Sequence, residues 1–379
     1  MAEPFERANI KIDKPQYSVF ETLRKIDSAR LILNPEFQRN FVWDAQRQSR
    51  LIESVLLRVP LPTFYFDATD QTHLQVVDGF QRLATLYAFC KRQTLRLEGL
   101  EFLTELHGRT FSELSDADQR IIEDTQLTVI TVEPGTPSRV KFVIFERINT
   151  GGIALNAQEI RHALSDQPTR AYLALLAADP TFVALTTNEL GDRTIDVRRM
   201  ADRESVLRFL ALKLNPEYTT GQAGLPLSYA ELLNQTIGDL RDLHLLTREQ
   251  LAAEFYDSMV KAQMIFEDLA FRKLPDLQRP GPFRAQLFDV WSLVLSQYPL
   301  DVLTRYRAEI VRYTATAFLD DAAFAGAITP TSDDWQSVAT RFATVHSIIE
   351  GVQRYENPIR FPLQFHAEPV DEDEDRDDE

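Results

Sequence analysis

The fold of the first part of this chain is decided by one stretch of sequence: Val76-Val77-Asp78-Gly79-Phe80-Gln81-Arg82. The apolar run over 74–77 predicts a short buried strand that delivers Asp78 at its C-terminal end. Gly79 allows a turn that a side chain can forbid, and the pattern after it predicts a helix over 80–92. Strand, tight turn and helix are therefore expected in direct succession.

The same alternation continues on both sides of this unit. Capping boxes that begin helices are predicted at Ser18 with Glu21 and at Asn156 with Glu159. Asp44 precedes an amphipathic helix that ends before Pro60. The remaining signals predict short strands over 30–33, 63–66 and 126–133 and a helix over 138–148.

Beyond residue 166 the periodicity is almost entirely helical. Helices are predicted over 198–212, 229–237, 248–271, 283–297, 300–318 and 335–353. We therefore predict an α+β fold with a mixed sheet over residues 1–165 and an all-helical domain over 166–365. An acidic disordered tail is expected over 366–379, because its charge block has no apolar surface to bury.

Composition narrows the class of protein. The 379 residues are 44% hydrophobic and 26% charged with a net charge of −16, which argues against a broad electrostatic grip on nucleic acid. No apolar run reaches the roughly 18 residues of a membrane span, so no membrane partner is expected. Cys90 is the single cysteine, and residues 1–11 show no secretory signal. These features predict a cytoplasmic protein without disulfides.

Several catalytic signatures are absent from the sequence. There is no Walker-type phosphate loop, no dinucleotide-binding glycine motif and no zinc-protease motif, and the six histidines are scattered. None of the lysines has an acidic residue two positions earlier, the core of many metal-dependent nucleases. An autonomous nuclease is therefore not expected.

The turn at Asp78 to Arg82 carries the clearest chemistry. The N-terminus of a helix attracts phosphate, and Arg82 can add a bidentate contact to it. Gln81 can orient a water or a phosphoryl oxygen, and Asp78 can hold Mg²⁺ or position Arg82. The alternative is structural: Asp78 caps the helix and Arg82 is a solvated residue of its first turn. Spacing alone leaves both interpretations open.

Two further clusters are candidates for the same site. Arg39 and Trp43 lie just before the helix that Asp44 caps, where Trp43 is either a core residue or a stacking surface for a base. Arg147 and Asn149 precede the pair Gly151-Gly152, which either ends a helix or forms an anion nest with them. We expect Arg39, Trp43, Asp78, Gln81 and Arg82 to surround one concave site.

Taken in order, these motifs resemble a known family. They are R-x-F-x-W at 39–43, L-I-E-S-x-L at 51–56, V-V-D-G-x-Q-R-L-x-T-L at 76–86 and F-E-R-I-N-T-G-G-x-x-L-x-x-Q-E-I-R at 145–161. They are similar to the GmrS-like N-terminal domain of GmrSD-type, Type IV modification-dependent restriction enzymes. The resemblance implies a fold related to ParB and sulfiredoxin.

The resemblance also implies a nucleotide-binding, NTP-hydrolysing site used in defence against phage or other foreign DNA. Its catalytic residues are then Asp78, Gln81 and Arg82, with a nucleoside triphosphate and Mg²⁺ at Asp78 as cofactors. The resemblance assigns nucleotide binding to Gly79, Arg39, Trp43, Arg147, Asn149, Gly151 and Gly152. The family's usual first Gln is replaced by Phe80, which puts hydrolysis in question more than binding.

Two hypotheses follow. In the first, the chain is a nucleotide-binding regulatory protein of a DNA-directed restriction system, which lacks its own His-Asn-His nuclease domain and works with a separate nuclease subunit on modified or foreign DNA. In the second, it is a non-catalytic module that keeps the fold without turnover and binds DNA or a protein.

Overall fold

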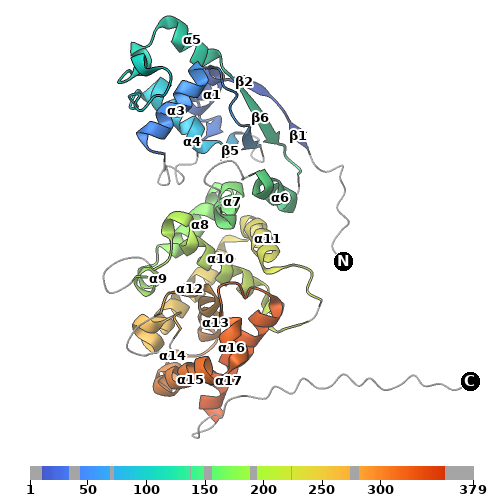
Figure 1. Ribbon diagram of the computed structural model, residues 1–379. Coiled ribbons are helices and arrows are strands. Elements are labelled where there is room, and N and C mark those ends of the chain that lie inside the picture. The colour runs from blue at the N-terminus through green and yellow to red at the C-terminus, as the bar shows by residue number, and fades with distance from the viewer. Residues whose placement is uncertain are drawn as a thin grey trace, which may run out of the picture. The chain divides into compact units, whose positions relative to one another are not determined.

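The structure is a computed structural model that describes residues 11–33, 43–68, 72–136, 138–148, 156–187, 194–222, 224–273 and 281–354. The chain forms two compact units (Figure 1). Unit 1 comprises Met1–Ala174, Asp196–Glu204 and Ala230–Leu243. Unit 2 comprises Leu175–Ile195, Ser205–Tyr229 and His244–Glu379. The predicted acidic tail lies outside the described residues.

Unit 1 is built on a mixed sheet of six strands, which confirms the predicted α+β class. The sheet runs in the order β1-β6-β4-β5-β3, and β2 also pairs with β6. β4 is parallel to β6 and antiparallel to β5, while β5 is parallel to β3. The bounds are β1 Ile12–Asp13, β2 Gln16–Ser18, β3 Leu31–Ile32, β4 Phe64–Asp67, β5 Leu74–Asp78 and β6 Gln126–Val132.

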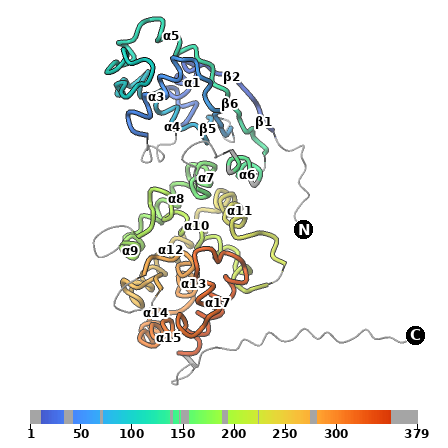
Figure 2. Tube along the Cα trace, in the orientation of Figure 1, coloured from blue at the N-terminus to red at the C-terminus, as the bar shows by residue number. Residues whose placement is uncertain are grey.

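Helices cover both faces of this sheet, because successive strand residues point to opposite sides. Phe64, Phe66 and Val76 face a large core built with α1 (Val19–Asp27), α3 (Ala45–Leu56), α4 (Phe80–Tyr87) and α5 (Asp116–Asp124). Tyr65 and Val77 face a smaller cluster with α6 (Ser138–Ile148) and α7 (Ala157–Leu164). The path of the chain through these layers can be followed in Figure 2.

Local capping fixes where the helices of unit 1 begin. Both predicted capping boxes are present, at Ser18 with Glu21 and at Asn156 with Glu159. The carboxylate of Asp44 accepts the backbone N–H of Arg47 at 2.7 Å and begins α3. Each of these side chains satisfies a backbone donor that the first helical turn leaves unpaired.

Unit 2 consists of packed helices, and no strand of the described chain follows β6. It contains α9 (Pro180–Leu185), α12 (Leu245–Phe266), α13 (Ala285–Ser296), α14 (Leu300–Arg305), α15 (Arg307–Asp320), α16 (Ala322–Ala327) and α17 (Trp335–Arg354). The helices α8 (Gln167–Ala177), α10 (Ala201–Leu214) and α11 (Tyr229–Asp242) contribute residues to both units. The helix predicted over 300–318 is interrupted at Tyr306, where α14 ends and α15 begins.

A buried ionic network stabilises the core of unit 2. The guanidinium of Arg208 donates to both carboxylate oxygens of Asp289, at 2.9 and 2.6 Å. Arg341 donates to the backbone carbonyls of Ala327 and Ser332. Buried charges are tolerated only when paired and hydrogen-bonded in this way.

No described helix has the length and apolar character needed to cross a membrane.

Candidate functional site

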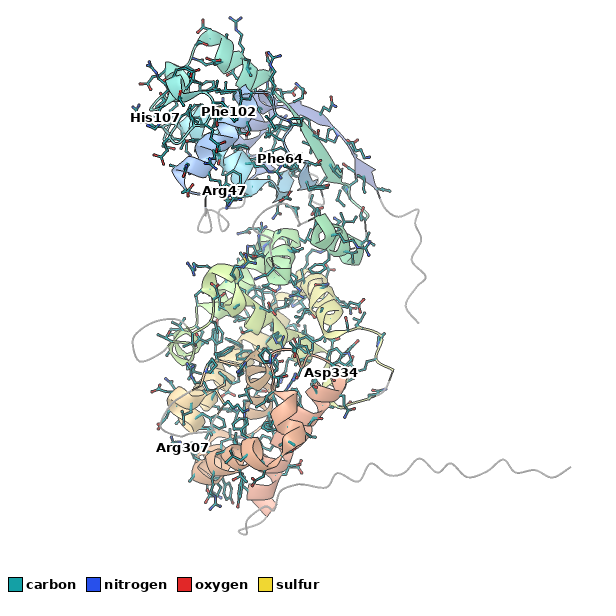
Figure 3. The ribbon with its side chains drawn as sticks, viewed as in Figure 1. Arg47, Phe64, Phe102, His107, Arg307 and Asp334 are labelled. Atoms are coloured by element: carbon teal, nitrogen blue, oxygen red, sulfur yellow. The ribbon has the colours of Figure 1, made fainter. Side chains whose placement is uncertain are left out.

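The turn between β5 and α4 has the geometry that the sequence predicts. Gly79 lies at the N-cap of α4 with a φ of +99°, a backbone conformation that side chains disfavour. The ring of Phe64 on β4 also occupies the space that a β-carbon on Gly79 would need. Glycine is therefore required here twice, by the backbone angle and by the close approach of an aromatic ring. Figure 3 shows Phe64 within the strands of unit 1.

Arg82 is held inside the protein rather than in solvent. It is 9% exposed, and its guanidinium donates to the backbone carbonyls of Pro62 and Thr63. It also pairs with the Asp78 carboxylate at 2.9 Å and lies 4.3 Å from the centroid of the Phe64 ring. The structural alternative of a solvated first-turn residue is therefore wrong. In this structure Arg82 joins the segment before β4 to the β5–α4 turn.

Asp78 is the part of this turn that reaches solvent, with a side chain that is 40% exposed. Burial raises the pKa of this carboxyl above its ordinary value, although Arg82 and the backbone N–H of Gly79 act in the opposite direction. The Asp78 carboxylate lies beside the N-terminus of α4, and Arg82 donates to its Oδ2 atom. The other side of the carboxylate can bind a cation or accept a hydrogen bond.

Phe80 and Gln81, which lie between Gly79 and Arg82, differ in role. Gln81 is half-buried in the first turn of α4, and its backbone carbonyl accepts from the hydroxyl of Thr85 at 2.8 Å. Phe80 is half-buried and packs against both hydrophobic clusters of unit 1. At the position where the resemblance implies an amide, this chain thus has an aromatic ring that contributes to the core.

The remaining predicted site residues are only partly within the described chain. Trp43 packs against the larger core, and the Arg47 guanidinium lies 5.0 Å from its ring centroid. Arg147 is exposed near the C-terminal end of α6. Four residues lie outside the described residues: Arg39, Asn149, Gly151 and Gly152. Of the predicted site, the structure brings together Asp78, Gly79 and Arg82.

One feature of unit 1 that sequence reasoning missed is a buried carboxylate. Glu53 on α3 is 5% exposed and accepts the backbone N–H groups of Glu101, Phe102 and Leu103 at 3.1, 2.7 and 2.9 Å. Burial opposes its ionisation, but these three donors outweigh burial and hold the pKa of Glu53 below its ordinary value. The sequence does contain one sign of this burial, because Glu53 stands among the apolar residues of α3. The loop that it fixes presents Phe102, which is 71% exposed (Figure 3).

A second missed feature is the buried ion pair between Lys141 on α6 and Asp67 on β4. The Lys141 Nζ lies 3.0 Å from Asp67 Oδ1, and both side chains are almost fully buried. The pair fastens α6 to the sheet, since separating two buried charges of opposite sign is costly. Its partners are 74 positions apart, and no local pattern marks them.

Metal-ligating side chains do not cluster in the described part of the chain, where no group of three or more His, Cys, Asp or Glu residues could hold an ion. Mg²⁺ in nucleotide sites is commonly held by one or two carboxylates together with the phosphates of the substrate. The partly exposed carboxylate of Asp78 fits that mode of binding.

Most of the N-terminal part of unit 1 matches a known protein family. Residues 19–165 match the family described as "GmrSD restriction endonuclease, N-terminal domain". The chain therefore has a GmrSD-like N-terminal domain, as its motifs predict, and the matched residues run from the start of α1 to the end of α7. No curated protein matches the chain.

Proposed function

We propose that this chain is a nucleotide-binding protein of a restriction or defence system directed against modified or foreign DNA. The matching family is described as part of a restriction endonuclease, which supports this context. A separate nuclease subunit then cleaves the DNA. We further propose that unit 1 has the ParB/sulfiredoxin type of fold and that the protein lies in the cytoplasm, in keeping with its single cysteine.

One observation supports the nucleotide site most strongly: the Asp78 carboxylate is fixed by Arg82 beside the left-handed Gly79 at the start of α4. Helix N-termini favour phosphate, because backbone dipoles and N–H groups point toward it. Gly79 supplies the left-handed backbone conformation with which α4 begins, and the Phe64 ring takes the space beside its α-carbon. The turn thus combines an anion-favouring helix end with a carboxylate able to bind the accompanying cation.

In this proposal the residues act in distinct ways. Asp78 holds Mg²⁺ together with the nucleotide phosphates, and the ion neutralises phosphate charge when it is bound. Gln81 orients a water or a phosphoryl oxygen from the first turn of α4. Arg82 is a positioning residue, since its guanidinium is already bonded to Asp78 and to two backbone carbonyls.

A screen of ligands by thermal shift tests this proposal. The full chain is heated with ATP, GTP, CTP, UTP and the corresponding dNTPs, each with and without Mg²⁺. A ligand that binds only the native state raises Tm, with about 2.7 kcal/mol of stabilisation at a hundredfold excess over Kd. We expect at least one nucleotide to do so and Mg²⁺ to increase the effect. A flat screen contradicts nucleotide binding.

The packing of Phe80 against both clusters favours a second candidate, a module that binds without turnover. Phe80→Gln distinguishes the two functions. Restored or increased phosphate release from the best nucleotide supports the NTP-hydrolysing function with an amide that positions water. A variant that folds, binds nucleotide and releases no phosphate supports the non-catalytic module.

A further inference from the structure

We propose that unit 1 carries a second binding site, for a compact phosphomonoester with hydroxyl groups, at the end of β5 opposite to Asp78. A pocket of about 380 Å³ opens there, lined by Lys25, Arg30, Ala68, Thr72, His73, Leu74, Glu133 and Pro134. Pockets of roughly 300 to 1,000 Å³ accommodate small organic ligands. Leu74 begins β5 and Asp78 ends it, so the two sites are about 13 Å apart along the strand.

The end of α1 fixes the backbones of Lys25 and Arg30, the two residues that bring positive charge to this pocket. The backbone N–H of Arg30 donates to the carbonyl of Lys25 at 2.9 Å, and the N–H of Ala29 donates to the carbonyl of Ile26 at 3.0 Å. With Ala29 at a φ of +53°, this is a Schellman motif. The turn therefore holds the backbones of Lys25 and Arg30 close together, although they are five positions apart.

Contacts with the strands orient these residues further. The backbone N–H of Leu74 donates to the Arg30 carbonyl at 2.8 Å, which ties Arg30 to the start of β5. The Lys25 Nζ lies 4.5 Å from the centroid of the Tyr17 ring on β2. Thr72 Oγ1 and His73 Nδ1, both of which line the pocket, are hydrogen-bonded at 2.8 Å, which restrains the imidazole.

The chemistry of the lining selects the ligand. Lys25 and Arg30 are the cations, and a guanidinium beside an ammonium suits a phosphate group. Glu133 contributes a carboxylate to the same pocket, which repels a bare phosphate and accepts hydrogen bonds from hydroxyl groups. A phosphate ester of a small polyol places its phosphate on the cations and its hydroxyls on Glu133. A sugar phosphate is the simplest ligand of this kind.

This site does not depend on nucleotide binding at the β5–α4 turn. Its test therefore uses ligands that carry no nucleobase. Ribose 5-phosphate and inorganic phosphate are titrated into the full chain by calorimetry at low ionic strength, with ribose as the uncharged control. We expect saturable binding of both phosphates, with ribose 5-phosphate the tighter, and no binding of ribose.

Substitutions at the pocket identify the groups responsible. Lys25→Gln and Arg30→Gln should each weaken ribose 5-phosphate about three- to tenfold, the range for charge-assisted contacts that are partly exposed. Arg24→Gln is the matched control, because Arg24 is an exposed cation on the same last turn of α1 that does not line the pocket. It should leave the affinity unchanged.

Glu133→Gln separates the two halves of the ligand. It should strengthen inorganic phosphate, because a like charge is removed, and weaken ribose 5-phosphate relative to phosphate. The absence of saturable binding at millimolar ligand overturns the proposal, and so does an equal loss of affinity in Arg24→Gln. Circular dichroism of each variant shows that its fold is intact.

Discussion

The ring of Phe64 occupies the space in which Gly79 would carry a β-carbon, so the strand β4 and the β5–α4 turn are fitted to each other at one residue. The same ring stacks with Arg82, whose guanidinium holds the segment before β4 and the Asp78 carboxylate. Phe64, Gly79 and Arg82 therefore determine together where Asp78 is presented.

Gly79→Ala should lower the free energy of unfolding by about 2 to 4 kcal/mol, since it adds backbone strain to a steric conflict with Phe64. Gly108→Ala is the control, because Gly108 has a φ of +79° but no atom within 4 Å of an added β-carbon. That variant should lose only about 1 kcal/mol. Urea unfolding of both measures the difference, and equal losses contradict the account of the turn.

Arg82→Ala should destabilise the unliganded protein by about 2 to 4 kcal/mol, because it removes the guanidinium that donates to two backbone carbonyls and to Asp78. Arg82→Lys keeps the charge but not the planar fork, and should recover only part of this loss. Urea unfolding measures stability. A positioning role further requires that Arg82→Lys change the Mg²⁺ dependence of nucleotide affinity, and an unchanged Mg²⁺ dependence argues that Arg82 is purely structural.

Glu53→Gln should reduce stability at pH 7 by about 1 to 2 kcal/mol and flatten its dependence on acid pH. The lowered pKa of Glu53 contributes stability that is fully present above the unfolded value of about 4.3. This contribution is lost as pH falls through the folded pKa. Unfolding followed between neutral and acid pH compares wild type with Glu53→Gln, and Glu105→Gln, at an exposed position, is the control. Parallel curves for wild type and Glu53→Gln contradict the assignment.

Much of the fold could be predicted because its signals are local. The capping boxes at Ser18 and Asn156, the cap at Asp44 and the glycine turn at Gly79 each depend on side chains within three or four positions. The position of Asp78, at the end of a strand and directly before a helix, could be predicted for the same reason.

The surroundings of the site could not be predicted, because they depend on distant parts of the chain. Arg82 donates to carbonyls 19 and 20 positions earlier, and Glu53 accepts donors 48 to 50 positions later. Phe80 contacts two clusters that come together only when the sheet is covered on both faces. The periodicity of apolar residues predicts which face of a helix or strand is buried, but it does not predict which partner a polar side chain bonds to.

Asp78 also gives the nucleotide site a pH dependence. Because burial raises the pKa of its carboxyl, Mg²⁺-dependent nucleotide affinity should begin to fall at a pH above the ordinary aspartate value of about 3.9. Affinity measured without Mg²⁺ should fall less over the same range. Calorimetric titrations at a series of pH values, with and without Mg²⁺, make the comparison. A Mg²⁺ effect that is constant with pH removes Asp78 as the group that binds the ion.

The most direct test of the nucleotide site is a calorimetric titration of the best nucleotide with Mg²⁺ into wild type, Asp78→Asn and Arg30→Gln. The account predicts that Asp78→Asn weakens binding about tenfold or more, by loss of a charged ligand to the ion, and that Arg30→Gln, at the opposite end of β5, leaves it unchanged. Full affinity in Asp78→Asn contradicts the assignment of the nucleotide to the β5–α4 turn.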